Sequence, residues 1–378
     1  MDERKLVKPD LKFAREVIGL GGESLKKCYQ CSTCTIMCPI APDDSPFPRK
    51  EMIWAQWGLK DKLRGDPDIW LCQRCTDCSI HCPRDAKPGE VMAALRGWVI
   101  AEHAVPRFLG KAFASARYLP LVAVIPILLV VAYLALWGDL HYPNTFNSGD
   151  EIILDHFIRD SHGDYGVFIM FGFMFGVLGL GILKFWKGLN ASAIVPATRS
   201  GLSIIQSLIR AVIETLKHAN FTRCETSRSA YWAHLGIMYG CIALIGATGI
   251  TFVLHYGMGW HSPWGIFSVT KVLGTIGTVL VMAGTGIALY KRLANDPTSG
   301  KSSYLDWFLL LLLILVTLSG FATWMLRIAE LEAATYWAYL VHIVLFFEFF
   351  IYLPFSKAAH IFYRLTAMTW SHYTGRGL

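Results

Sequence analysis

The chain contains two copies of one cysteine pattern, and each copy ends in proline. Each reads C-x2-C-x2-C-x3-C-P, so three closely spaced cysteines are followed by a fourth that is set off before the proline. Three thiolates at this spacing can hold one face of a cubane, whereas the fourth points away and can serve a second cluster. The pattern therefore predicts two [4Fe–4S] clusters with crossed ligands. The first would be held by Cys28, Cys31, Cys34 and Cys82, and the second by Cys72, Cys75, Cys78 and Cys38.

Zinc and disulfides are the competing interpretations of these eight cysteines. Structural zinc sites are usually built from paired C-x2-C units, not from triplets with a distant fourth ligand. No stretch before residue 117 resembles a signal peptide, so we expect a reducing compartment, where disulfides are rare. Iron–sulfur ligation is therefore the better interpretation. The two remaining cysteines, Cys224 and Cys241, are expected to be buried, inert thiols.

Composition places most of the chain in a membrane. Of its 378 residues, 54% are hydrophobic and only 17% are charged, which is too apolar for one soluble globule. Residues 1–117 have ordinary charge density, whereas long uncharged stretches recur from residue 118 onward. A helix needs about 20 apolar residues to cross a bilayer. Six segments meet this requirement, near 118–138, 165–187, 231–255, 265–290, 304–326 and 335–356.

The charges between these segments predict the orientation. The connection 139–164 has six acidic residues and one basic residue, whereas seven lysines and arginines lie between residues 184 and 228. Because basic loops favour the cytoplasmic side, we expect a multi-pass protein of the cytoplasmic membrane, with both termini and the cysteine domain in the cytoplasm. This topology and anionic lipid explain the net charge of +7, so no nucleic-acid partner is expected.

Four histidines lie in or near the ends of the third and sixth segments. His342 and His360 are 18 residues apart, so on one continuous helix they would share a face, about 27 Å apart. His234 and His255 are 21 residues apart, or about 32 Å. The third segment runs outward and the sixth inward, which puts His234 level with His360 and His255 level with His342. Facing histidines can ligate a b-type haem, and the alternative for each histidine alone is an interfacial or hydrogen-bonded side chain.

Helical patterns position these residues. Apolar spacing and stop signals predict helices from Lys50 to Leu63 and from Pro88 to about His103. The segment 198–219 is expected to be an amphipathic helix on the cytoplasmic interface. The predicted fold is therefore all-α. It has a helical two-[4Fe–4S] ferredoxin-like domain in residues 1–105, a basic linker at the membrane surface in 106–117, and a six-helix transmembrane cytochrome b bundle in 118–378.

The residues around the histidines resemble the haem-binding helices of the respiratory nitrate reductase gamma subunit family. The similarity lies in the stretch HLGIMYG from His234 to Gly240, and in the spacing of His342 and His360, with Pro-Phe-Ser before the second of them. The cysteine domain resembles the C subunit of heterodisulfide reductase. A chain that joins both modules resembles the QmoC family, from the quinone-interacting membrane-bound oxidoreductase complexes of sulfate reducers.

The resemblance implies that His234 and His360 hold the haem nearer the cytoplasm and that His342 holds an outer haem. The sequence departs from the family at the partner of His342. The family places that ligand ten residues after the first histidine, where this chain has Leu244. The alternatives are His255 at the end of the third segment, which we favour, His162 at the head of the second segment, or no outer haem.

The resemblance also implies menaquinone as the substrate in the membrane. Lys271 lies about six residues into the fourth segment, and an intramembrane lysine is a candidate for function. The alternative is that Lys271 snorkels to the outer surface. Glu348 lies deeper, among four phenylalanines. It would either relay protons for the quinone or be neutral and hydrogen-bonded to a neighbouring helix.

These features predict an electron conduit, because six-coordinate haem and fully cysteine-ligated cubanes leave no open position for a substrate. The chain would be the electron-transfer subunit of a quinone-linked oxidoreductase, not catalytic alone. It would connect menaquinol, through one or two haem b groups and two clusters, to cytoplasmic flavin and iron–sulfur subunits of the same complex. By resemblance, the final acceptor is adenylylsulfate reductase, in sulfate reduction. The alternatives are the membrane arm of a heterodisulfide reductase, and a transporter or redox sensor without haem.

Overall fold

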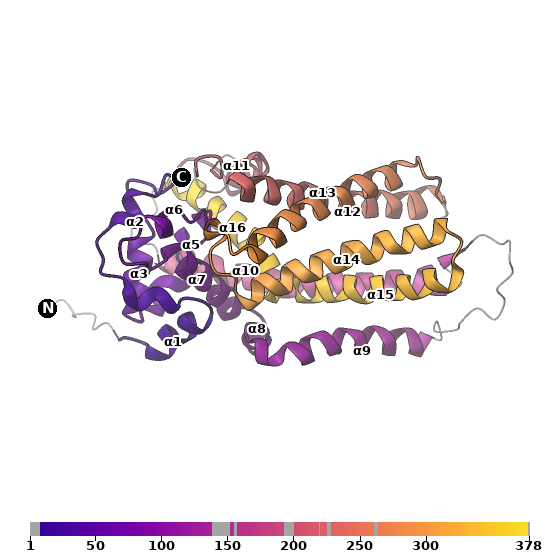
Figure 1. The fold of residues 1–378 in the computed structure, drawn as a ribbon, viewed down its shortest axis with the longest axis horizontal. Coiled ribbons are helices and arrows are strands. Elements are labelled where there is room, and N and C mark those ends of the chain that lie inside the picture. Colours follow the sequence, from indigo (N-terminus) through magenta and orange to yellow (C-terminus); the bar gives the residue numbers. More distant parts are fainter. Residues whose placement is uncertain are drawn as a thin grey trace.

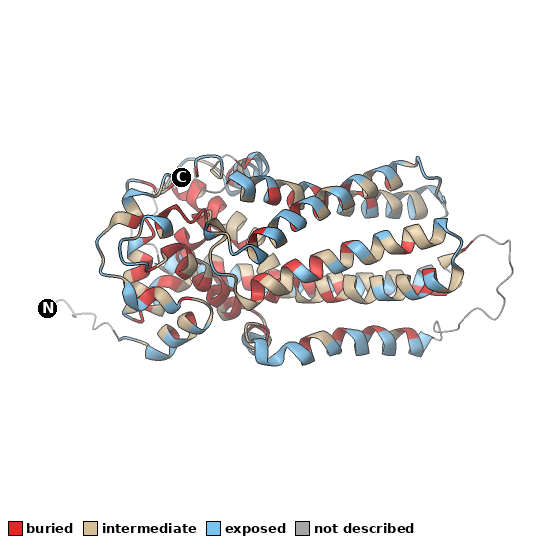
Figure 2. Cartoon of the chain, viewed as in Figure 1, coloured by how far each residue is buried: buried red, intermediate tan, exposed pale blue. Residues whose placement is uncertain are grey.

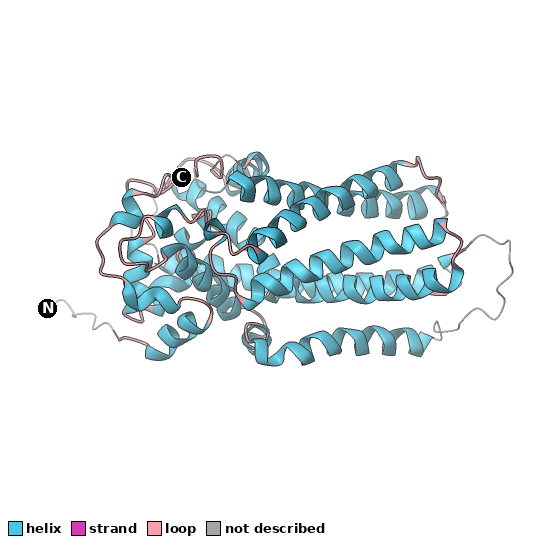
Figure 3. Cartoon of the chain, in the orientation of Figure 1, coloured by secondary structure: helices cyan, strands magenta, loops and turns pink. Residues whose placement is uncertain are grey.

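The computed structural model describes residues 8–137, 152–154, 157–192, 200–218, 220–224, 228–260 and 264–376. A compact group of helices lies at one end, and long helices extend from it roughly side by side (Figure 1). We call the end of the long helices that carries the compact group the inner end. The described part is 76% helical and has no strand (Figure 3), which confirms the predicted all-α fold. Most of the acidic connection 139–164 lies outside the described residues.

The compact group is the cysteine domain, built from short helices around one long helix. The long helix, α7 (Pro88–His103), has the predicted bounds and begins with proline, which suits the first position of a helix. It is buried along most of its length (Figure 2). The other helices of the domain are α1 (Leu11–Gly19), α2 (Thr33–Ile36), α3 (Arg49–Gln56), α4 (Lys60–Arg64), α5 (Asp68–Leu71) and α6 (Asp77–Ile80).

The helix expected from Lys50 to Leu63 is in fact two helices, α3 and α4, so the prediction of one continuous helix is wrong. Gly58 between them has a φ of +70°, and a Cβ atom there would lie 2.7 Å from the backbone nitrogen of Asp10. That nitrogen donates a 3.0 Å hydrogen bond to the carbonyl of Gly58. The N-terminal segment therefore packs against the chain at this point, and a glycine leaves room for it.

Six helices are long and apolar enough to cross a membrane, which agrees with the six predicted segments. The predicted amphipathic helix is α11, whose apolar side chains are exposed while Ser207 and Ala211 are buried. The expected linker 106–117 is mostly helical, with α8 and a 3-10 turn at Ala116–Tyr118. The described α-helices from residue 107 onward are α8 (Arg107–Phe113), α9 (Leu119–Trp137), α10 (Asp160–Ser192), α11 (Ile204–Lys217), α12 (Arg228–Met258), α13 (Val269–Leu293), α14 (Tyr304–Ile328), α15 (Glu332–Tyr352) and α16 (His360–Thr374). The six that could cross a membrane are α9, α10, α12, α13, α14 and α15.

The helix of the sixth segment does not continue to His360. After α15 the chain makes two short 3-10 turns, Leu353–Phe355 and Lys357–Ala359, and α16 begins at the histidine itself. Pro354 has no backbone N–H to donate, so the regular helix ends before it. The prediction that His342 and His360 share one face of a continuous helix is therefore wrong. α16 packs instead against α5, α10 and α11 at the inner end.

α12 and α13 pack with their backbones close together. Gly236 and Gly240 of α12 face α13, and a Cβ atom at Gly240 would lie 2.8 Å from the carbonyl oxygen of Gly277. Small residues four positions apart allow such an approach between membrane helices. Leu244 also lies against Gly277, so this face of α12 is turned toward α13.

One apolar core joins the cysteine domain to the long helices. Side chains of α1, α3, α5 and α7 form a single buried cluster with residues of α10, α11 and α16. The contact is closest at Gly65, where a Cβ atom would collide with the carbonyl of Gly188 in α10. Each Å² of apolar surface buried here contributes about 25 cal/mol against separation. The cysteine domain is therefore fixed against the inner ends of the helices.

A buried charge cluster lies where the C-terminus returns to the cysteine domain. Glu51, Asp66 and Asp68 are almost fully buried, with carboxylate oxygens within 4.8 Å of one another. Lys50 and Arg376 both form ion pairs with Asp68. Three carboxyl groups thus face two cations, and the charges balance when one carboxyl group is neutral. Burial and then repulsion from Asp66 raise the pKa of Glu51 well above its ordinary value, and burial raises the pKa of Asp66 to about 6.

Replacing Glu51 with glutamine is expected to flatten the pH dependence of stability. A carboxyl group with a raised pKa stabilises the fold at low pH, and this contribution is lost as the pH rises through the folded pKa, which is about 6 for Asp66 and well above the ordinary value for Glu51. The Tm of the wild-type chain in detergent should therefore fall between about pH 5.5 and about pH 8, and Glu51→Gln should melt a few degrees higher at the upper pH. Asp61→Asn, at an exposed side chain of the same domain, is the control. An unchanged pH dependence in Glu51→Gln would contradict a neutral Glu51.

Candidate functional site

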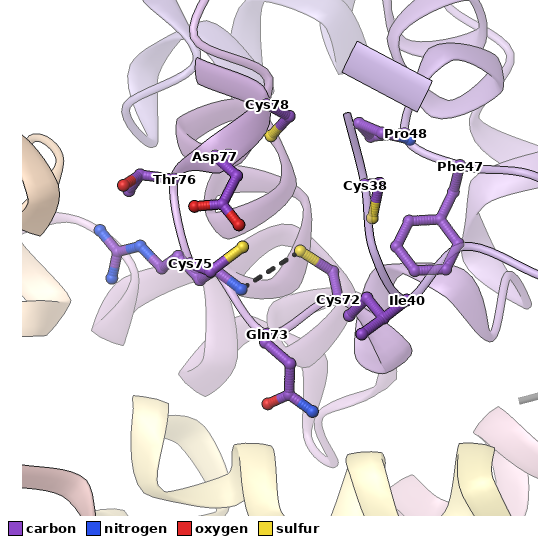
Figure 4. A pocket seen from close by; sticks show the side chains of 12 residues that line it. Cys38, Ile40, Phe47, Pro48, Cys72, Gln73, Cys75, Thr76, Asp77 and Cys78 are labelled. Atoms are coloured by element: carbon purple, nitrogen blue, oxygen red, sulfur yellow. Dashed lines mark hydrogen bonds between the residues drawn. The ribbon is translucent and has the colours of Figure 1, made fainter. Parts of the chain in front are cut away.

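Four of the eight motif cysteines line one pocket in the cysteine domain. Figure 4 shows the side chains of Cys72, Cys75 and Cys78 around this pocket, together with Cys38 from the first motif. This is the set expected for crossed ligation, in which the last cysteine of one motif joins three cysteines of the other. We call these four residues the second group. Ile40, Phe47 and Pro48 complete the apolar side of the pocket.

The remaining four motif cysteines form the first group. Burial raises the pKa of Cys34 to about 11, and repulsion from Cys28 and from Cys82 of the other motif adds to this shift. Burial also raises the pKa of Cys38 to about 12, with repulsion from cysteines of the second group. The two crossed residues are thus each electrostatically coupled to the opposite motif. Metal binding requires thiolates, so cluster insertion must displace protons from these buried thiols.

The two motifs have the same backbone geometry. Gln30 and Arg74, at matched positions, and Ser32 and Thr76, also matched, all have φ between 56° and 71°. Left-handed residues in such loops turn N–H groups toward one concave side. The backbone N–H of Arg74 donates to the sulfur of Cys72 at 3.3 Å, and hydrogen bonds to cluster sulfurs help to set the reduction potential. The two motifs are therefore two copies of one loop, whose shape suits a cluster.

Buried arginines connect the second group to the long helices. Arg96 of α7 and Arg364 of α16 both donate to the carbonyl oxygen of Cys72, the latter at 3.2 Å. Arg74, inside the motif, forms a 3.0 Å ion pair with Asp306 near the start of α14. Burial lowers the pKa of Arg364 to about 10, so it stays positively charged near neutral pH. These cations stabilise negative charge at the second group and fix its place against the bundle.

Two of the predicted haem ligands lie together at the inner end. The rings of His234, near the start of α12, and His360, at the start of α16, have centroids 6.4 Å apart. When two imidazoles bind the same metal ion from opposite sides, with metal–nitrogen distances of roughly 2 Å, their ring centroids lie about 6 Å apart. The separation of this pair therefore fits two ligands of one haem iron. Burial, with a further contribution from His234, lowers the pKa of His360 to about 3. His360 is therefore the neutral imidazole that a metal requires.

Hydrogen bonds indicate which ring nitrogen of each histidine is available. The Nδ1 of His360 lies 2.7 Å from the carbonyl oxygen of Lys357, so it is the protonated nitrogen and donates. The Nδ1 of His234 lies 2.8 Å from Nε2 of a third histidine, His218. His218 donates through its own Nδ1 to the carbonyl oxygen of Leu216 at 3.2 Å, and so its Nε2 accepts from His234. His234 and His360 therefore both keep the lone pair of Nε2 for a metal.

α16 joins this histidine pair to the second group of cysteines. His360 and Arg364 are four residues apart, about 6 Å along the helix axis, and Arg364 donates to the carbonyl of Cys72. α2, which carries Cys34 of the first group, lies at the end of the molecule away from the long helices (Figure 1). The order along the molecule is therefore the histidine pair, then the second group, then the first group.

The other predicted histidines lie apart from this pair. His342 packs on α14, with its Nδ1 3.1 Å from a backbone carbonyl oxygen of that helix. His255 lies near the outer end of α12, and His162 lies beside Trp137 of α9, with ring centroids 4.5 Å apart. Leu244, at the position of the family's ligand, faces α13. The pairing of His342 with His255 or with His162 stays a prediction.

The two predicted quinone residues lie at opposite ends of the bundle. Lys271 is the third residue of α13, at the outer end, with its Nζ 5.7 Å from the ring centroid of Trp324. The expectation that it lies six residues into a span is wrong, because the helix begins only two residues earlier. Glu348 lies one turn before the inner end of α15 and is 7% exposed. Tyr352, one turn further, and Tyr304 of α14 pack on one small core nearby.

Two residues near the metal-ligand candidates were missed by the sequence analysis or assigned no role in it. His218 was not singled out. Cys224, expected to be inert, is buried as predicted, but its sulfur lies within 4.8 Å of ligand atoms of Cys75 and Asp77. The hydrogen bond with Cys224 raises the pKa of Cys75. His218 and Cys224 both lie between α11 and α12, shortly before the helix that carries His234. That nearness in sequence is the only signal by which either residue could have been linked to the site.

Two known families match different parts of the chain. Residues 24–86 match the 4Fe-4S dicluster domain, which supports the presence of iron–sulfur clusters. Residues 164–375, more than half of the chain, match citrate utilization protein B. Citrate utilization protein B of Escherichia coli is 25% identical over 371 residues, which cover 91% of this chain and 89% of that protein. The similarity to that protein therefore includes both the cysteine domain and the long helices.

The cysteine domain is also similar to iron–sulfur subunits of heterodisulfide reductases. It is 38% identical over 88 residues to the C subunit of the H(2):CoB-CoM heterodisulfide,ferredoxin reductase of Methanothermobacter marburgensis, which is 23% of this chain and 47% of that protein. It is 41% identical over 100 residues to the C 2 iron-sulfur subunit of the CoB--CoM heterodisulfide reductase of Methanocaldococcus jannaschii, 24% of this chain and 53% of that protein. The chain thus spans about half the length of these relatives. No solved structure matches the chain.

The comparisons confirm part of the expected resemblance. The N-terminal domain is similar to the C subunit of heterodisulfide reductase, as predicted. The C-terminal region is similar to citrate utilization protein B, which the sequence analysis did not name. The resemblance of the long helices to the nitrate reductase gamma subunit, and of the whole chain to the QmoC family, stays a prediction.

Proposed function

The chain belongs to the citrate utilization protein B family, and from this premise we propose that it is the membrane electron-transfer subunit of a quinone-linked oxidoreductase. It would carry electrons between menaquinol and a partner protein and would not be catalytic alone. His234 and His360 would hold haem b, and the first and second groups of cysteines would each hold one [4Fe–4S] cluster. When bound, these groups supply one-electron steps.

The observation that supports this proposal best is the line formed by the histidine pair and the two groups of cysteines. His360 lies one helical turn from Arg364, which donates to Cys72 of the second group, and the first group lies beyond it. The shared apolar core holds these groups at fixed separations. A fixed arrangement suits electron transfer, whereas a transporter needs parts that rock about a central site.

The first group is placed to meet a partner. Cys31 is exposed, and the neighbouring Tyr29 and Ile36 are 70% and 80% exposed. The guanidinium of Arg84 lies 4.1 Å from the ring centroid of Tyr29. Exposed apolar side chains with a basic rim are typical of a docking surface. We place the cytoplasmic flavin and iron–sulfur subunits of the complex here.

Menaquinol oxidation needs an acceptor for protons within the membrane. Glu348 is a buried carboxyl group in a span, and such a group must be neutral or have a polar partner. The hydroxyl of Tyr304 is buried and has no hydrogen-bond partner among the described residues. A quinol hydroxyl would supply a partner to both, so we place quinol oxidation near Glu348, at the inner end. Lys271, at the outer end, is the second candidate.

The side of the membrane follows from charge. The cysteine domain, α11, α16 and the basic ends of α10 and α13 all belong to the inner end (Figure 1). Because basic loops favour the cytoplasm, we place both termini and the cysteine domain on the cytoplasmic side of the cytoplasmic membrane. The final acceptor follows from resemblance alone: adenylylsulfate reductase in a quinone-interacting complex of sulfate reduction, or a heterodisulfide in a complex like those of the relatives of the cysteine domain.

Anaerobic reduction by a quinol tests this function. The purified chain in detergent is mixed with menadiol, a soluble menaquinol analogue, and haem b absorbance and cluster EPR signals are followed. We expect menadiol to reduce haem b, and Glu348→Gln to slow that reduction at least about tenfold while leaving reduction by dithionite unchanged. Lys271→Gln tests the second candidate, because slower reduction in that variant instead would place quinol oxidation at the outer end. A chain with full cluster iron and no haem b absorbance would overturn the proposal and favour a redox sensor.

A further inference from the structure

His218 is a third histidine, and the amphipathic helix α11 sets its place. It follows directly after α11, in the left-handed conformation with a φ of 52°, and is 7% exposed. Its Nδ1 donates to the carbonyl of Leu216, which also accepts a 2.9 Å hydrogen bond from the hydroxyl of Tyr239 in α12. The last carbonyls of a helix lack partners within the helix, and these two donors satisfy one of them. α11 and α12 therefore hold the ring of His218 in one orientation.

This orientation places Nε2 of His218 2.8 Å from Nδ1 of His234. We propose that His218 is a positioning residue for haem ligation: it accepts the Nδ1–H of His234, holds the ring of that ligand, and makes it more electron-donating toward the iron. The inference rests on the proposed function, because it requires a haem iron between His234 and His360. Metal-bound histidines commonly donate their second ring N–H to an acceptor, which orients the ring and raises its basicity.

The two ligands of the proposed haem are not equivalent in this respect. His360 donates its Nδ1–H to the backbone carbonyl of Lys357, whereas His234 donates to an imidazole nitrogen, which is a more basic acceptor than an amide oxygen. A stronger acceptor leaves more electron density on the ligand nitrogen and stabilises oxidised iron, so it lowers the reduction potential. His218 is not itself a ligand, because its Nε2 is occupied by the hydrogen bond from His234.

Potentiometric titration of haem b absorbance, together with low-spin haem EPR, tests this inference. In His218→Ala, the ratio of reduced to oxidised haem at the wild-type midpoint should rise about tenfold, which equals a 59 mV increase in the midpoint. His218→Gln keeps an accepting oxygen and should give a smaller increase. Phe221→Leu is the control for packing, since its ring lies 6.5 Å from that of His218 and 6.3 Å from that of His234 but has no nitrogen or oxygen atom to accept a hydrogen bond.

The outcomes separate this inference from the function on which it rests. A His218→Ala chain that keeps haem with the wild-type midpoint and EPR spectrum would overturn it. If His218→Ala loses haem, the glutamine variant decides: haem with a raised midpoint supports the inference, and haem with the wild-type midpoint overturns it. Absence of haem from the wild-type chain would instead overturn the proposed function itself.

Discussion

Replacing His360 with alanine is expected to abolish the haem b absorbance that arises from the inner end of the purified chain. The Nε2 of His360 carries one of the two lone pairs that would hold the iron, and its removal would leave a single protein ligand. The loss should be complete in a pyridine haemochrome assay if the chain holds one haem, and half if it holds two. His234→Ala should remove the same spectral component, because both residues would serve one iron.

A second buried histidine on α16 provides the control. His372 lies on the same helix, is buried, and is 3.2 Å from the carboxylate of Glu214. His372→Ala therefore tests whether any loss of a buried imidazole in α16 releases haem, and it should leave haem content unchanged. Loss of different spectral components in His360→Ala and His234→Ala would refute the shared site. His342→Ala then reports on the outer haem: unchanged absorbance would mean that the chain holds haem only at the inner end.

Features carried by local spacing could be predicted from the sequence. The six spans follow from runs of about 20 apolar residues, and all six agree with helices of the structure. α7 has its predicted bounds because Pro88 can begin a helix and Pro106 follows its end. The cysteine ligands are likewise recognisable, because three of the four in each group lie within seven residues of chain.

Features that depend on distant contacts could not be predicted. The break between α3 and α4 exists because Asp10 packs against Gly58, and no residue near Gly58 in the sequence predicts that contact. Five turns of one helix were expected between His342 and His360, whereas the regular helix ends just before Pro354. The chain nevertheless brings the ring of His360 next to that of His234. His218 lies outside the spans and owes its position to a left-handed residue after α11 and to contacts with α12.

The expectation that His234 and His360 lie together was thus reached by partly incorrect geometry. The inner pair was predicted from the levels of histidines on straight helices, but α16 is a separate helix that packs into the cysteine domain. This difference matters for function, because a straight sixth helix would lack the contacts that α16 makes with α5 of the cysteine domain. In the observed fold, Arg364 lies one turn after His360 in α16 and donates directly to the carbonyl of Cys72 in the second group.

The crossed arrangement of cysteines leads to the second large effect, which concerns Cys38. Cys38→Ser should eliminate the EPR signal of the cluster held by the second motif and spare the cluster of its own motif, with loss of about half of the cluster iron. The reason is geometric: Cys38 lines the pocket formed by Cys72, Cys75 and Cys78, whereas the other cysteines of its motif lie with Cys82.

Matched cysteine variants identify the two signals and make this outcome decisive. Cys72→Ser and Cys31→Ser, each at an uncrossed position, assign one EPR signal to each motif, and Cys241→Ser, in α12, controls for loss of a cysteine remote from both groups. Cys38→Ser should then reproduce Cys72→Ser, and Cys82→Ser should reproduce Cys31→Ser. Uncrossed ligation predicts the reverse pairing. The second group, which accepts hydrogen bonds from Arg96 and Arg364, lies between the histidine pair and the first group. Cys38→Ser should therefore interrupt electron flow from haem b to the first group, while menadiol still reduces the haem.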